Sequence, residues 1–151
     1  FAGGPVGAVV EAIFTRADEA GKAAGAEAQA AAQELAAALP KAERRRALRE
    51  GDVAERRVER REKSGTIDLV LRLTALWLRD LAALADGAAD AVRAVDRPGA
   101  LAEDAERCRD GAALREAVLD VEQARTTLAL NPNERLMLTA LGLRLAGRLS
   151  G

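Results

Sequence analysis

Residues 66–85 contain the most apolar stretch of the sequence, and this stretch constrains the fold more than any other. Its polar positions Asp68, Arg72 and Arg79 fall close to one narrow stripe of a helix, and apolar residues cover most of the remaining circumference. A helix that is apolar on most sides is surrounded by other helices. We therefore expect this segment to form the centre of a helical bundle, with Trp77 in the core because of the area that its ring buries.

The rest of the chain offers helices that could surround this segment. Apolar residues make up 49% of the 151 residues and aromatic residues only 2%. Alanine and leucine supply most of the hydrophobicity, and both favour helices. The residue types that strands prefer are comparatively scarce. We predict an all-α fold, a helical bundle of about five to seven helices.

Start and stop signals divide the first part of the chain into two expected helices. The first runs from about Pro5 to Phe14, and Thr15 with Asp18 forms an N-cap pair for the second, which stops before Pro40. The second helix is rich in alanine, which leaves little bulk to bury, and two glycines weaken its first half. We expect it to be a poorly anchored, partly exposed arm.

The segment 41–63 is strongly charged. It holds ten basic and six acidic residues, so it is locally positive in a chain of formal net charge −1. The pattern predicts a solvated helix stabilised by mixed pairs such as Glu59 with Lys63, followed by a bend at residues 64–66. Clustered arginines also neutralise phosphates, so a basic helical nucleic-acid-binding module is an alternative. The interleaved acidic residues and the missing aromatic residues argue against it.

Three further helices are expected in the C-terminal part. A turn at residues 96–99 leads into a short helix of about 98–108 that ends at Cys108, and Gly111 separates it from a helix at 112–130. The last helix begins at Asn131 as a cap, with a proline and a capping-box glutamate after it. The helix at 112–130 has one apolar face at helical spacing, composed of Leu114, Ala117, Val118, Val121, Ala124 and Leu128.

The composition leaves few means for catalysis. Histidine, tyrosine and cysteine are customary residues of nucleophilic and zinc chemistry. The chain has no histidine, no tyrosine and one cysteine. It contains neither a GxxxxGK loop nor a GxGxxG motif after a strand. We predict a chain that is not an enzyme and binds no cofactor or metal. The single cysteine and the lack of a secretory signal favour the cytoplasm, and the charges at residues 68–80 exclude a membrane span.

Three stretches of the chain resemble the C-terminal domain of the delta-prime subunit of the bacterial DNA polymerase III clamp loader. They are WLRDLAAL, AVDRPGALAEDAERC and LREAVLDVEQARTTLALNPNERLMLTALGLRL. The family has a turn before its penultimate long helix, matched at 95–99, and an arginine late in that helix, matched by Arg125. Its closing helix opens on an asparagine and is rich in leucine, matched from Asn131 to Leu145. The resemblance covers residues 66–148 well and residues 15–63 loosely.

The opening sequence FAGGPVGAVVEAIF is similar to the last helix of the AAA+ lid domain in the same family. In the ATP-hydrolysing gamma and tau relatives this helix carries a sensor arginine, and Val6 stands at that position here. The resemblance implies that the chain starts inside a longer protein whose AAA+ module lies upstream. It divides the chain into a lid remnant at 1–14, Ala-rich and charged helices at 15–63, and a collar bundle at 64–151.

The resemblance also implies a function. The chain would be the oligomerisation collar that joins gamma or tau and delta subunits, and it would reach the sliding clamp and primed DNA only through the complex. A collar of gamma or tau itself is the alternative within the same architecture. Candidate interface residues are charged residues expected at the rims of apolar helix faces, for which a solvent-exposed charge or an intramolecular pair is the other possibility. They are Arg79, Asp80, Arg125, Arg135 and Arg144.

Overall fold

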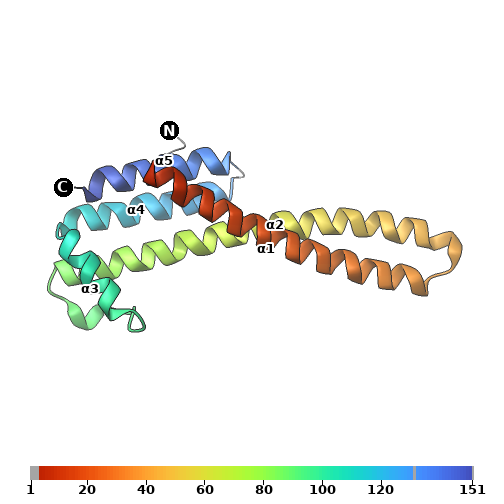
Figure 1. Ribbon diagram of the computed structural model, residues 1–151, viewed down its shortest axis with the longest axis horizontal. Helices are drawn as coiled ribbons and strands as arrows, with labels where there is room; N and C mark the ends of the chain where they lie inside the picture. Colours follow the sequence, from red (N-terminus) through yellow and green to blue (C-terminus); the bar gives the residue numbers. More distant parts are fainter. Residues whose placement is uncertain (1–3, 131, 151) are drawn as a thin grey trace. The chain divides into compact units, whose positions relative to one another are not determined.

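The computed structural model describes residues 4–130 and 132–150, and every regular element among them is helical. This confirms the predicted all-α fold with its number of helices. Figure 1 shows five α-helices and a short 3-10 turn, which follow one another in the order α1 (Pro5–Ala38), α2 (Lys41–Ala85), η1 (Ala89–Ala91), α3 (Pro98–Arg107), α4 (Gly111–Leu128) and α5 (Glu134–Leu149).

The chain forms two compact units. The hairpin unit comprises Ala12–Ile67, and the bundle unit combines the residues up to Glu11 with those from Asp68 onward. Helices α1 and α2 each contribute residues to both units. The predicted division into a lid remnant, charged helices and a collar concerns the domains of a parent protein and stays a prediction.

Two of the predicted helix boundaries are wrong. Helix α1 continues through Thr15 and Asp18, which therefore cap no second helix, and α2 continues through residues 64–66 without a bend. Asp18 instead binds Lys63 in an ion pair of 2.6 Å, and the Lys63 ammonium lies 5.4 Å from the centre of the Phe14 ring. Local cap and bend signals are weak compared with such contacts between neighbouring helices, so the helices run on.

The hairpin unit is held together by a close approach of its helices where glycine and alanine meet. Gly21, Gly25 and Gly51 are all buried. A Cβ atom added to Gly21 would lie 2.9 Å from the backbone oxygen of Glu59, and one added to Gly51 would lie 2.5 Å from the Cβ of Ala32. The prediction of a poorly anchored arm is therefore corrected. The glycines that lower helix propensity are the residues that let the backbones approach.

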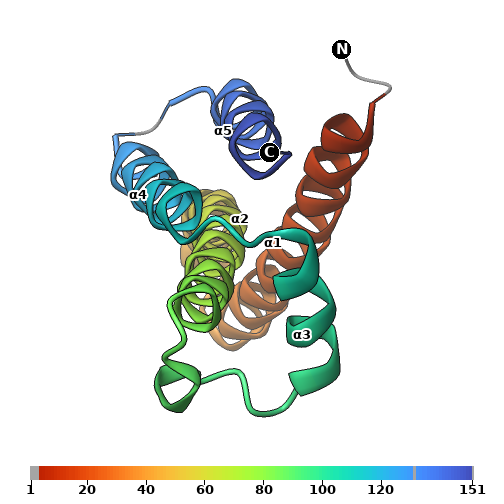
Figure 2. The same ribbon diagram turned by 90° about the vertical axis from the view of Figure 1, so that its left-hand side faces the viewer.

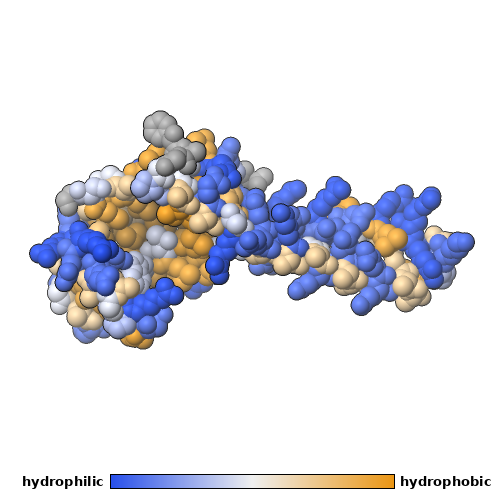
Figure 3. Space-filling model, viewed as in Figure 1, coloured by the Kyte–Doolittle hydropathy of each residue, from blue (hydrophilic) through white to orange (hydrophobic). Residues whose placement is uncertain are grey.

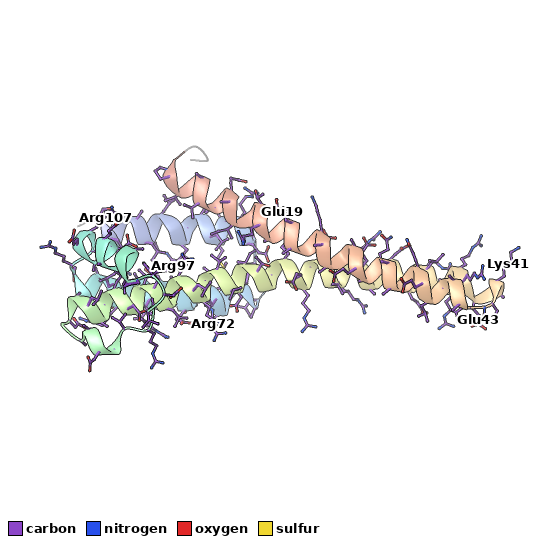
Figure 4. All side chains as sticks on the ribbon, turned by 60° about the horizontal axis from the view of Figure 1, so that its bottom comes forward. Glu19, Lys41, Glu43, Arg72, Arg97 and Arg107 are labelled. Atoms are coloured by element: carbon purple, nitrogen blue, oxygen red, sulfur yellow. The ribbon has the colours of Figure 1, made fainter. Side chains whose placement is uncertain are left out.

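The turn between α1 and α2 is stabilised by an arginine. Pro40 cannot continue α1 because it lacks an amide hydrogen. Arg44 reaches back and donates from Nε to the carbonyl oxygen of Leu39 at 2.9 Å and from Nη2 to that of Ala37 at 3.2 Å. These carbonyl groups have no partner within the helix, so a cation at this end is favourable. Lys41 and Glu43 lie at the same end of the hairpin unit (Figure 4).

The core of the bundle unit lies between α4, α5, the second part of α2 and the first residues of α1 (Figure 2). Helix α3 lies near the end of α2 (Figure 1). Helices α4 and α5 pack against each other. The predicted apolar face of α4 is buried from Leu114 to Ala124. The core of this unit consists of Val10, Leu71, Ala75, Leu78, Leu81, Ala82, Leu101, Leu114, Ala117, Val118, Val121, Ala124, Leu138 and Leu141.

Helix ends in the bundle unit follow recognisable capping patterns. Helix α2 ends in a Schellman motif, in which Gly87 has a φ of 76° and the amide of Ala88 donates to the carbonyl oxygen of Ala83 at 2.8 Å. Asp110 caps α4 by accepting hydrogen bonds from two amides of its first turn. The predicted cap Asn131 lies outside the described residues. Helix α5 starts later than predicted, with Asn133 as its cap.

Candidate functional site

Arg125 and its partners tie two helices of the bundle unit together. Its Nε lies 2.9 Å from Oδ1 of Asp68, its Nη2 lies 3.3 Å from Oδ2 of the same carboxylate, and its Nη1 lies 3.0 Å from Glu122. The hydrogen bond with Asp68 raises the pKa of the Arg125 guanidinium above its usual value. Arg79 also reaches Glu122, at 3.4 Å. Both arginines therefore join α2 to α4.

Two other predicted interface arginines also form ion pairs within the unit. Arg144 lies 3.8 Å from Asp120, whose second oxygen binds Arg148 at 2.6 Å. Arg135 on α5 forms an ion pair with Glu11 on α1. The geometry thus gives each predicted arginine an intramolecular partner, and an additional role toward another subunit stays a prediction.

Asp80 is the buried charged residue of the core, with 6% of its surface exposed. Its Oδ2 accepts hydrogen bonds from the backbone amides of Arg93 at 3.1 Å and Ala94 at 2.7 Å. A carboxylate that accepts backbone hydrogen bonds in this way holds the segment after η1 against α2. Asp80 therefore has a positioning role inside the fold, and an additional role at a subunit interface stays a prediction.

Trp77 lies at the edge of the core rather than inside it. It is partly buried, and its indole Nε1 donates to Oδ2 of Asp104 on α3 at 3.0 Å. The expected core position is therefore corrected to a position where the polar end of the ring can reach a partner. This hydrogen bond attaches α3 to α2.

Val6, the predicted position of a lost sensor arginine, contacts α5. A Cβ atom added to Gly142 would lie 2.5 Å from Cγ1 of Val6. Only a residue without a side chain fits opposite Val6 at this spacing, which makes the contact one of close helix packing. Whether the position once carried a nucleotide sensor stays a prediction.

An apolar stripe on α2 is exposed, which the sequence did not suggest. The stripe consists of Leu69, Leu73 and Leu76, with exposed fractions of 53%, 57% and 38%. Their spacing of four and three residues places them on one helix face. The expectation that α2 is surrounded here is therefore wrong, because only its other side, around Leu71 and Leu78, is buried. Apolar side chains gather on the bundle unit in Figure 3.

A groove extends the apolar stripe toward α3. Its volume is about 490 Å³. Helix α2 lines it with Leu73, Leu76, Trp77 and Asp80, and the segment before α3 lines it with Arg93, Ala94, Asp96 and Arg97. The stripe and groove together offer an apolar surface with a charged rim, which is the composition of a protein–protein interface.

Helix α5 carries a second, smaller apolar surface. Leu136 is 68% exposed and Leu143 is 48% exposed, and their spacing of seven residues puts them on one face. The leucines of this leucine-rich helix therefore lie on two different faces. Leu138 and Leu141 face the core, and the other two face outward.

A metal site and a membrane-spanning helix find no support in the described ranges. No group of three or more metal-ligating side chains comes together there. No helix of this part of the chain is long and apolar enough to cross a membrane. None of the known protein families, curated proteins or solved structures with which the chain was compared matches it. The two apolar surfaces are therefore the strongest candidates for a functional site in the bundle unit.

Proposed function

We propose that the chain is a non-catalytic assembly domain, the collar of a clamp-loader subunit of the delta-prime type that acts in bacterial DNA replication. Its partners would be the gamma or tau and delta subunits, and it would act on the sliding clamp and primed DNA only through the complex. The cytoplasm, where replication takes place in bacteria, would be its location. The resemblance of residues 66–148 to this family motivates the proposal.

The observation that carries the proposal is the exposed apolar stripe of Leu69, Leu73 and Leu76. Fully burying a leucine side chain is worth about 1.5–3 kcal/mol. Leucines at this spacing are the anchors that a helix presents to a groove or to another helix. Exposed contiguous apolar surface on a domain marks an interaction site more often than a free surface.

A collar subunit sits between neighbours, so it needs more than one interaction surface. The stripe on α2 and the pair Leu136 and Leu143 on α5 provide two. The cations near the groove, Arg93 and Arg97, suit the polar rim that surrounds the apolar centre of such interfaces.

The test is assembly in gel filtration with purified gamma or tau and delta subunits. The wild-type chain is expected to co-elute with them. Leu73→Asp should abolish co-elution with one neighbour, because it places a charge in the middle of the stripe. Leu119→Asp is the matched control, since Leu119 is 61% exposed on α4 and belongs to neither surface. Absence of any complex with the wild-type chain would contradict the proposal.

A further inference from the structure

The outer face of α2 in the hairpin unit is covered by arginines. We call Arg45, Arg49, Arg56, Arg57 and Arg60 the arginine face, and all five are exposed. At about 100° per residue they fall within roughly 120° of the helix circumference. The seam with α1 runs through Gly51 and Glu55. Arg49 and Arg57 lie two positions from these residues and therefore about 200° away, and Arg45, Arg56 and Arg60 lie between the seam and this opposite side.

The acidic residues of the same segment do not neutralise this face. Glu55 and Glu59 lie on the seam, where their side chains contact the positions of Gly25 and Gly21. Glu50 binds Arg46 at 2.8 Å. Asp52 is at the edge of the arginine face. The charges that alternate along the sequence are thus partly separated in space. Glu55 and Glu59 lie on the seam, while Glu50 and Asp52 flank the arginine face, which weakens the objection that the interleaved acids raise against a basic surface.

The arginines of this face are free to bind a ligand. Within residues 4–130 and 132–150, none of the five has an ion-pair or hydrogen-bond partner. By contrast, Arg79, Arg125 and Arg135 in the bundle unit are all paired. Five unpaired guanidinium groups on one face repel one another, so a partner with a high density of negative charge would stabilise them.

We propose that the arginine face binds the phosphate backbone of a double-stranded nucleic acid. From Arg45 to Arg60 the helix rises about 22 Å. Duplex DNA presents one negative charge per about 1.7 Å of its axis, so every arginine along this length finds a phosphate nearby. Guanidinium groups bind phosphates in a bidentate manner. The proposal concerns a different unit from the proposed assembly function and does not depend on it.

The chemistry of the face favours a duplex over a single strand or a membrane. Single-strand binding relies on aromatic side chains that stack on bases, and the arginine face has none. A helix that lies on a membrane needs large apolar residues beside its cations. Here Val53, which is 51% exposed, is the large apolar residue among the arginines. It lies with Ala54 in a shallow depression of about 660 Å³ flanked by Arg49 and Arg57.

The depression is suited to a protruding ridge such as a sugar-phosphate backbone. Its floor is apolar, and its edges carry Arg49, Arg57 and the ion pair of Arg46 with Glu50. A sugar can pack on the floor while its phosphates meet the arginines of the edges. No side chain of the face is arranged to read base edges. Binding should therefore be independent of sequence.

The test is a salt titration of the full chain with a 20-base-pair duplex, measured by fluorescence anisotropy. If all five arginines contact phosphates, log K should fall with log salt at a slope of about −4.5, and affinity should fall about 500-fold between 50 and 200 mM salt. The triple variant Arg49→Gln, Arg56→Gln, Arg60→Gln should flatten the slope by about 2.7. The titration is carried out once with duplex DNA and once with duplex RNA, and the two affinities show which duplex is preferred. Binding of either duplex supports the proposal.

A charge-matched control distinguishes binding by the arginine face from an effect of the net charge of the chain. Arg72→Gln, Arg93→Gln, Arg109→Gln removes the same three charges from exposed positions of the bundle unit, and its slope should equal that of the wild type. Equal slopes for the two triple variants would overturn the proposal. So would a chain that binds phosphatidylserine vesicles but no duplex, or no duplex binding at 50 mM salt. Circular dichroism confirms that both variants remain helical.

Discussion

Arg125 on α4 and Asp68 on α2 face each other in a two-pronged ion pair, with Nε–Oδ1 at 2.9 Å and Nη2–Oδ2 at 3.3 Å. The arginine side chain is 27% exposed, so water screens the pair only in part. A planar guanidinium that engages both oxygens of a carboxylate also fixes the relative rotation of the two helices. The pair therefore sets the register of α4 on α2.

Arg125→Lys should destabilise the bundle unit, because an ammonium group cannot reproduce the fork geometry. A double-mutant cycle of Arg125→Gln with Asp68→Asn should give a coupling energy of about 1 kcal/mol in urea unfolding. The pair Arg46–Glu50, whose side chains are 81% and 65% exposed, is the control and should couple more weakly. A coupling energy at Arg125 no larger than at Arg46 would refute the structural role.

Gly51→Ala should destabilise the hairpin unit, although alanine has the better helix propensity. The new Cβ would lie 2.5 Å from the Cβ of Ala32, so the helices must separate. Overpacking of this kind costs about 1–3 kcal/mol and outweighs the gain in propensity of about 1 kcal/mol. Gly65→Ala on the same helix meets nothing within 4 Å and should stabilise the chain. In thermal unfolding, the melting temperature of Gly51→Ala should lie below that of the wild type, and the melting temperature of Gly65→Ala should lie above it.

Asp80→Ala should loosen the segment that follows η1. The backbone amides of Arg93 and Ala94 would lose the carboxylate that accepts their hydrogen bonds. Both bonds are only partly buried, so water replaces them in part and the loss should be about 1 kcal/mol for each. Hydrogen exchange at Arg93 and Ala94 should accelerate at least tenfold. Exchange at Leu138 in α5 serves as the internal reference and should change less. Unchanged protection at both amides would show that Asp80 does not hold this segment.

Asp104→Ala should shift the fluorescence of Trp77, which is the single tryptophan of the chain, to longer wavelength. Without the acceptor of its indole hydrogen bond, α3 is held less firmly and the ring becomes more exposed to water. Glu103→Ala is the neighbouring control, because Glu103 is exposed on the same helix. An emission maximum that is identical in both variants would exclude the link between α3 and Trp77.

Sequence patterns predicted the short helices well and the long helices poorly. Helices α3 and α4 follow from a proline-containing turn and from an apolar face at helical spacing. The continuity of α1 and α2 does not follow, because Thr15 and Gly65 carry local signals for a helix boundary. Contacts with the neighbouring helix, such as the ion pair of Asp18 with Lys63, decide the outcome there. Such contacts depend on residues about 45 positions apart in the chain.

The candidate sites could be predicted only in part. Charged residues such as Arg125 were identified, but their partners were not, because no local pattern shows that Asp68 lies opposite. The exposure of Leu73 has no sequence signal, since a leucine that faces a partner and one that faces the core have the same spacing. The arginine face could have been found from the spacing of Arg45, Arg49, Arg56 and Arg60 alone.

The seam of the hairpin unit has a consequence for how its surface can evolve. Gly21, Gly25 and Gly51 lie where the two helices approach each other, so the exposed arginine face of α2 is not part of this contact. Substitutions there change what the surface attracts and leave the scaffold as it was. Selection can therefore change the ligand preference of this surface one residue at a time while the contact between the two helices is kept.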